Sequence, residues 1–206
     1  MTSTKDPAKE FHANRVMYIT PHNGFVKSFR VYDITSNVKS PYPSNEFADE
    51  AEKVGQEMPE DKAKWVFNRG ESSCTATVHA GGQSDNAPIV AEWSQSRWQH
   101  NSNSFAFPED SPHSSHNVIM KRTRFHKSEC FVQDSVEYLW KFDGLFRLKL
   151  ILTKNIGGNK IIVARYRGRF RAIKNGGTLV FDDTLVDPLM VVLTCVTMLR
   201  KIRQSD

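Results

Sequence analysis

The chain has 206 residues, the length of one large domain, and it is 39% hydrophobic and 25% charged. This composition can build a packed core and excludes collagen-like and wholly disordered chains. No stretch reaches the ~20 apolar residues of a membrane-spanning helix, and residues 1–20 lack the apolar run of a secretory signal, so we expect a cytoplasmic protein without a transmembrane segment. The formal net charge is +5, but residues 1–110 carry a net −4 and residues 111–206 a net +9. This asymmetry favours an anionic partner, either phospholipid or nucleic acid.

Short runs of β-branched and aromatic residues, separated by turn residues, predict strands along most of the chain. The first two predicted strands are 15–20 and 25–33. Residues 42–62 are acidic with few large apolar side chains, which predicts a surface insertion or a short amphipathic helix outside the core. Strand signals resume at 64–67, 74–80 and 88–93. Residues 94–117 are rich in Ser, Asn and His, and we predict a second surface insertion there.

The second half of the chain reads as a meander of further strands, predicted at 116–122, 129–133, 135–142, 145–153, 160–167, 169–173 and 178–182. With the earlier segments this makes about a dozen strands. An open sheet usually has ~4–6 strands, so the number favours a closed barrel or a two-layer sandwich. No βαβ alternation is present, and the fold class is therefore mainly β.

The last segment predicts a helix of a different character. Asp187 is a suitable N-cap and Pro188 a suitable first helical residue. From 189 to 199 only Thr194 and Thr197 interrupt the apolar residues. A helix that is apolar all round must be surrounded by membrane or by protein. At ~16 residues, or ~24 Å, it is short for a bilayer, so we expect it inside the sheet structure.

A resemblance to a known superfamily rests on four segments taken in order: SVEYLWK at 135–141, VARY at 163–166, GTLVF at 177–181 and LVDPLMVV at 185–192. Together they resemble the tubby C-terminal-like superfamily, in particular a fungal family of unknown function, over residues 64–203. Phospholipid scramblases and LURP-one-related proteins are relatives. The resemblance implies a single domain, 1–206, with insertions at 42–62 and 94–117. It implies a closed antiparallel barrel of about twelve strands threaded by a C-terminal hydrophobic helix.

Animal tubby proteins bind phosphoinositide headgroups through basic side chains, but no motif here maps residue by residue onto their site. The residues themselves show two basic clusters. If 164–172 is a strand, its alternation places one set of guanidinium groups on a single face: Arg165, Arg167, Arg169 and Arg171. Such a row can bind phosphate, or it can be an outward face whose arginines pair with acidic neighbours. A second cluster, which either extends this surface or is a solvated strand end, contains Lys121, Arg122 and Arg124.

No signature of an enzyme, a cofactor site or a metal site is present in the sequence. The leading hypothesis is a non-enzymatic module that binds anionic ligands, phosphoinositide headgroups above all, peripherally at a cytoplasmic membrane surface. The first alternative is a protein-interaction or structural module that uses the acidic and the Ser/His-rich insertions. An enzyme or small-ligand carrier is less favoured because the helix would fill the barrel. Nucleic acid is a less favoured partner than lipid.

Overall fold

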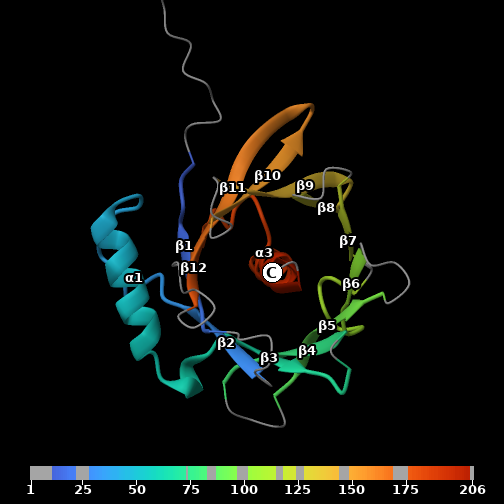
Figure 1. Cartoon of the computed structure of the whole chain (residues 1–206), viewed down its shortest axis with the longest axis horizontal. Helices are drawn as coiled ribbons and strands as arrows, with labels where there is room; N and C mark the ends of the chain where they lie inside the picture. Colours follow the sequence, from blue (N-terminus) through green and yellow to red (C-terminus); the bar gives the residue numbers. More distant parts are fainter. Residues whose placement is uncertain are drawn as a thin grey trace, which may run out of the picture.

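Figure 1 shows the computed structural model of the chain, which describes residues 11–21, 28–72, 74–82, 87–96, 102–114, 118–123, 128–143, 149–168 and 176–204. Within these residues twelve strands form one closed barrel in the order β1-β12-β11-β10-β9-β8-β7-β6-β5-β4-β3-β2. The strands are β1 (Arg15–Ile19), β2 (Ser28–Asp33), β3 (Trp65–Arg69), β4 (Thr75–Ala80), β5 (Ile89–Gln95), β6 (Ser102–Ala106), β7 (Val118–Arg122), β8 (Ser128–Gln133), β9 (Val136–Phe142), β10 (Lys149–Ile156), β11 (Asn159–Gly168) and β12 (Gly177–Phe181). The helices are α1 (Asn45–Glu57), the short 3₁₀ helix η2 (Glu60–Lys62) and α3 (Pro188–Gln204).

The barrel closes because β1 pairs antiparallel with both β12 and β2. Each strand therefore has a partner on both sides, and the sheet has no open edge. The predicted mainly β fold and the closed antiparallel barrel of about twelve strands are confirmed. The strand predicted at 169–173 lies outside the described residues.

The prediction of a surface insertion at 94–117 is wrong for residues 102–106. These residues form β6, which pairs with β5 and β7 as a full member of the barrel. Asn103 and Phe105 point inward and are each 1% exposed, while their neighbours are polar or small. A strand with one large apolar side chain shows too little alternation of apolar and polar residues for sequence analysis to distinguish it from a loop.

The acidic segment 42–62 contains the predicted short amphipathic helix, α1, but it does not lie outside the core as predicted. Three residues, four apart, are buried against the outer surface of the barrel: Phe47, Ala51 and Gly55. Phe47 and Ala51 form a second hydrophobic cluster with Val16, Tyr18, Tyr32 and Val180, among others. Figure 1 shows α1 beside β1 and β12, outside the ring of strands. The helix thus covers one side of the barrel rather than projecting from it.

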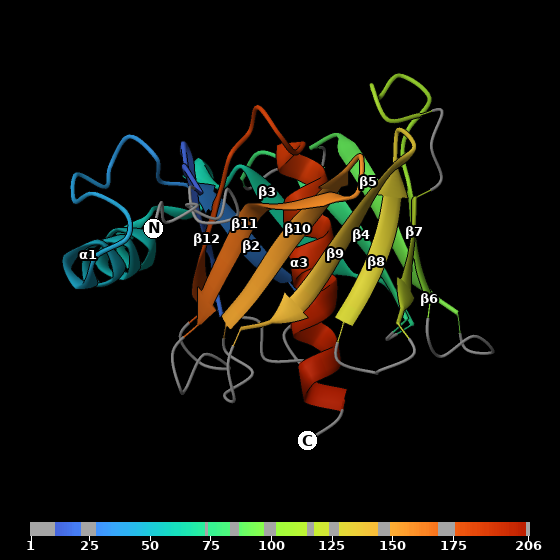
Figure 2. The ribbon, with the colours of Figure 1, turned by 90° about the horizontal axis from the view of Figure 1, so that it is seen from above.

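Helix α3 begins as predicted, because Asp187 caps it: the backbone N–H of Met190 donates to the Asp187 carboxylate at 2.9 Å. Every residue of α3 from Leu189 to Leu199 is buried. These residues share one hydrophobic cluster with inward-facing residues of all twelve strands. Figure 1 shows α3 end-on within the ring, and Figure 2 shows it running along the barrel with its C-terminus at one end.

Among the helices that the structure describes, none is both long and apolar enough to cross a membrane.

Candidate functional site

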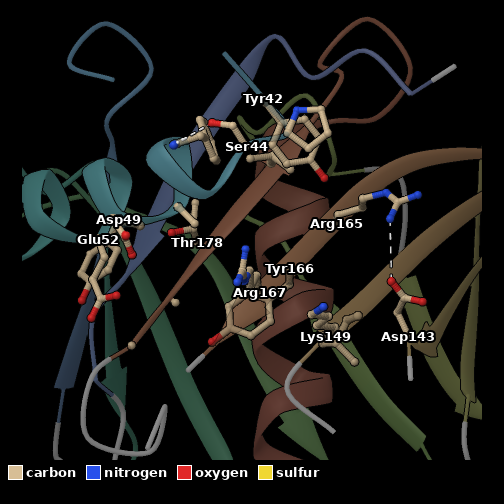
Figure 3. A pocket seen from close by; sticks show the side chains of 18 residues that line it. Tyr42, Ser44, Asp49, Glu52, Asp143, Lys149, Arg165, Tyr166, Arg167 and Thr178 are labelled. Atoms are coloured by element: carbon tan, nitrogen blue, oxygen red, sulfur yellow. Dashed lines mark hydrogen bonds and ion pairs between the residues drawn. The ribbon is translucent and has the colours of Figure 1, made fainter. Parts of the chain in front are cut away.

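A pocket of about 380 Å³ lies on the outside of the barrel, between α1 and the strands β10, β11 and β12 (Figure 3). One wall comes from the segment before α1 and from its first turns, including Tyr42, Ser44 and Phe47. The facing wall comes from the strands and carries Lys149, Arg165 and Arg167, among others. The pocket therefore joins two parts of the chain that are about a hundred residues apart.

Strand alternation places the basic side chains in this pocket. Along β11, Tyr166 is buried in the barrel, while Arg165 and Arg167 on either side of it point outward. In the barrel ladder Arg167 lies opposite Lys149 on β10 and opposite Thr178 on β12. Neighbouring strands are ~4.8 Å apart, so these three side chains form a short row across the outer surface.

A β-bulge in β11 sets this alignment. The register between β10 and β11 shifts between Leu152 and Thr153, which leaves Val163 without a partner in the ladder. As a result, the consecutive residues Val163 and Ala164 are both buried. After them, outward and inward side chains alternate again, starting with Arg165 outward. Because of this one-residue shift, Lys149 stands opposite Arg167 rather than opposite Tyr166.

The three cations differ in what surrounds them. The Arg165 guanidinium lies 3.7 Å from the Asp143 carboxylate and 5.9 Å from the centre of the Phe11 ring. Lys149 and Arg167 are exposed, and within the described residues neither has an ion-pair partner. Lys149 and Arg167 are thus the charges that an anion can reach without displacing a carboxylate.

The far side of the pocket is acidic and aromatic. Asp49 and Glu52 of α1 line it, as Figure 3 shows. Tyr18 of β1 is also a lining residue. Burial, and then the negative charge of Glu52, raises the pKa of Tyr18 to about 12. The pKa of Tyr42 is also raised, chiefly by burial, although the nearby cations Arg165 and Arg167 act in the opposite direction. The pocket therefore has a basic end on the strands and an acidic end on the helix.

The N-terminus of α1 contributes to the electrostatics of the pocket. Ser44 is the N-cap, and its hydroxyl accepts a hydrogen bond from the backbone N–H of Phe47 at 3.0 Å. Ser44, Phe47 and Ala48 all line the pocket. Because a helix N-terminus carries a partial positive charge, the backbone of this first turn adds to the positive potential of the arginines, whereas Asp49 and Glu52 farther along α1 oppose it.

The structure describes four of the seven basic residues that the sequence analysis selected, and these four lie on two strands. Arg165 and Arg167 lie in the pocket, whereas Arg169 and Arg171 lie outside the described residues. The second cluster is on β7, with β8, β9 and β10 between it and β11. There Lys121 is exposed, Arg122 is half-buried opposite Glu129, and Arg124 is not described. The two clusters therefore do not form one continuous stripe among the described residues.

Sequence analysis missed Lys149 and the α1 wall. Lys149 fell within a predicted strand, but nothing local indicated that it stands opposite Arg167, since the bulge sets that register. The cap signal at Ser44 could have located the start of α1. It could not show which part of the barrel the helix covers.

No family model matches this chain, and no curated protein or solved structure matches it.

Proposed function

We propose that this protein is a non-enzymatic, tubby-like barrel, threaded by its C-terminal helix, that binds phosphate-bearing anionic headgroups. Phosphoinositide headgroups at a cytoplasmic membrane surface are the ligand class we propose. The observation that carries the proposal is the convergence of Lys149, Arg165 and Arg167, from two adjacent strands, on one pocket. The N-terminal turn of α1 faces them across that pocket.

The chemistry of these groups suits a phosphate. An arginine guanidinium offers two parallel N–H donors that match two phosphate oxygens, and a lysine ammonium adds a compact positive charge. The pocket volume of about 380 Å³ is within the range of small-ligand sites. Arg167 and Lys149 supply the primary contacts, and Arg165 joins them by exchanging Asp143 for a phosphate oxygen.

The test is a titration with a soluble inositol bisphosphate, measured by calorimetry. The double variant Lys149→Gln/Arg167→Gln removes two charge-assisted contacts worth about 1.5–3 kcal/mol each, so binding should weaken by about a hundredfold or more. Arg165→Gln should weaken it less, because Arg165 already has a carboxylate partner. The matched control is Lys62→Gln/Lys160→Gln, which removes the same charge from two exposed lysines outside the pocket. Equal affinity in the pocket variant and the control would refute the proposal.

The alternative of a protein-interaction module relied on the two segments 42–62 and 94–117. The first packs on the barrel and forms a wall of the pocket, and the second contributes β6 to the barrel. Both segments thus have structural roles in the described residues. The convergence of basic groups makes the anion-binding function the better supported of the two.

A further inference from the structure

Outward-facing basic and acidic side chains concentrate at opposite ends of the barrel. At the end where α3 ends (Figure 2), five of the described strands carry an exposed basic side chain at or next to their terminus. Arg69 ends β3, and the other four residues lie on the arc from β7 to β11. These four, here called the basic rim, are Lys121 on β7, Lys141 on β9, Lys149 on β10 and Arg167 on β11. The ladder agrees with this placement, since Lys149 pairs with Arg167 and Lys141 pairs with Ser128 at the start of β8. The described acidic residues at this end include Asp143 beside Arg165, Glu129 opposite Arg122 and Glu71 in the turn after β3.

The opposite end of the barrel is largely acidic. Asp134 and Glu137 lie at the turn between β8 and β9, and the segment before α3 carries Asp182, Asp183 and Asp187. Two basic residues at this end have local partners: Arg15 forms an ion pair with Asp183, and the Lys154 ammonium donates to the carbonyl of Leu185 at 2.8 Å. Lys160, near the start of β11, is exposed. The molecule therefore presents a positive end and a negative end.

We propose that the basic rim docks end-on against an anionic bilayer, with the acidic end facing away from it. The proposal rests on the headgroup function proposed above, because Lys149 and Arg167 belong to both the pocket and the rim. A headgroup held by these two residues thus lies at the level of the rim. Lys121 and Lys141, outside the pocket, then act only on the surrounding lipid charge.

The geometry suits a flat surface. The strand ends of a closed barrel form one rim, and at ~4.8 Å per strand the arc from β7 to β11 spans about 19 Å. A plane of lipid headgroups meets all four cations at once, and each basic residue near an anionic surface strengthens binding by about fivefold. This long-range attraction orients the protein before the pocket engages a single headgroup.

The test compares three double variants with equal loss of charge. The rim variant is Lys121→Gln/Lys141→Gln, and neither residue lines the pocket. The pocket variant is Lys149→Gln/Arg167→Gln. The control, Lys62→Gln/Lys160→Gln, changes exposed lysines at the opposite end. Each is assayed by flotation with phosphatidylcholine vesicles containing phosphatidylserine and a phosphoinositide, and by titration with soluble inositol bisphosphate.

The rim variant should bind these vesicles about 25-fold more weakly while its affinity for inositol bisphosphate stays within about twofold. The pocket variant should lose both activities, and the control should keep both. Vesicle binding by the rim variant equal to that of the control would overturn the docking proposal and leave the headgroup function intact. Wild-type affinity of the pocket variant for inositol bisphosphate would instead overturn the proposed function. Tighter binding to duplex DNA than to vesicles, with the same rim dependence, would assign the rim to nucleic acid and refute docking to a bilayer.

Discussion

A buried hydrogen bond between β9 and α3 allows a sharp test of the helix inside the barrel. The indole N–H of Trp140 donates to the Thr194 hydroxyl at 2.9 Å, and that hydroxyl donates to the carbonyl of Met190 at 2.7 Å. Both side chains are fully buried. Thr194→Val keeps the shape of the side chain but removes the acceptor, so the indole N–H would remain buried without a partner. We expect this to lower the free energy of unfolding by about 1–3 kcal/mol.

The same helix supplies a matched control. Thr197 is also buried, and its hydroxyl donates to the Leu193 carbonyl at 2.9 Å, so Thr197→Val removes a hydroxyl without leaving a side-chain donor unpaired. Urea unfolding followed by tryptophan fluorescence measures both variants. In a Trp140→Phe background, Thr194→Val should cost little, because the donor is already gone. If Thr194→Val is as stable as Thr197→Val, the reasoning fails.

Three further predictions concern packing and pH. Gly55→Ala should lower the free energy of unfolding by about 1–3 kcal/mol despite the better helix propensity of alanine, because its Cβ would lie within 2.1–2.5 Å of the Tyr18 ring atoms. Urea unfolding measures this variant beside the control Lys53→Ala, which changes an exposed residue of the same helix. A Gly55→Ala variant more stable than the wild type would contradict the prediction. In the folded protein the pKa of Tyr18 is raised from 10.0 to about 12, so the folded state favours the neutral phenol. The stability linked to this shift is fully present below pH 10, and about 2–3 kcal/mol of it is lost as the pH rises to 12. Tyr18→Phe should reduce that alkaline loss in pH-dependent unfolding, and an unchanged profile would count against it. Val192→Asp places a charge without a partner at a fully buried position of α3 and should prevent folding, so a soluble variant with a cooperative melt would refute the burial of this helix face.

The arginine row shows where sequence reasoning about function reached its limit. Alternation along β11 correctly placed Arg165 and Arg167 on one face of the strand, because side chains two residues apart in a strand point the same way. The structure adds that this face is the outer one, with Tyr166 buried on the other. The partner of Arg167 depends on a bulge at Val163, which arises where two strands pair. No local pattern marks that bulge, so Lys149 could not be assigned to the site.

The sequence by itself determined the strands with clear alternation, the capped start of α3 at Asp187 and the burial of that helix from Leu189 to Leu199. These features follow from interactions within a few residues of each other or from the cost of exposing apolar surface to water. Only the tertiary structure decided that β6 belongs to the barrel and that α1 covers its outer surface. It also placed Lys121 of β7 and Arg167 of β11 at the same end of the barrel with three strands between them, and it placed the pocket beside β10, β11 and β12. These outcomes depend on pairing between segments that are distant in the chain. Such pairing is set by strand order and register around the closed barrel, so no local sequence pattern predicts it.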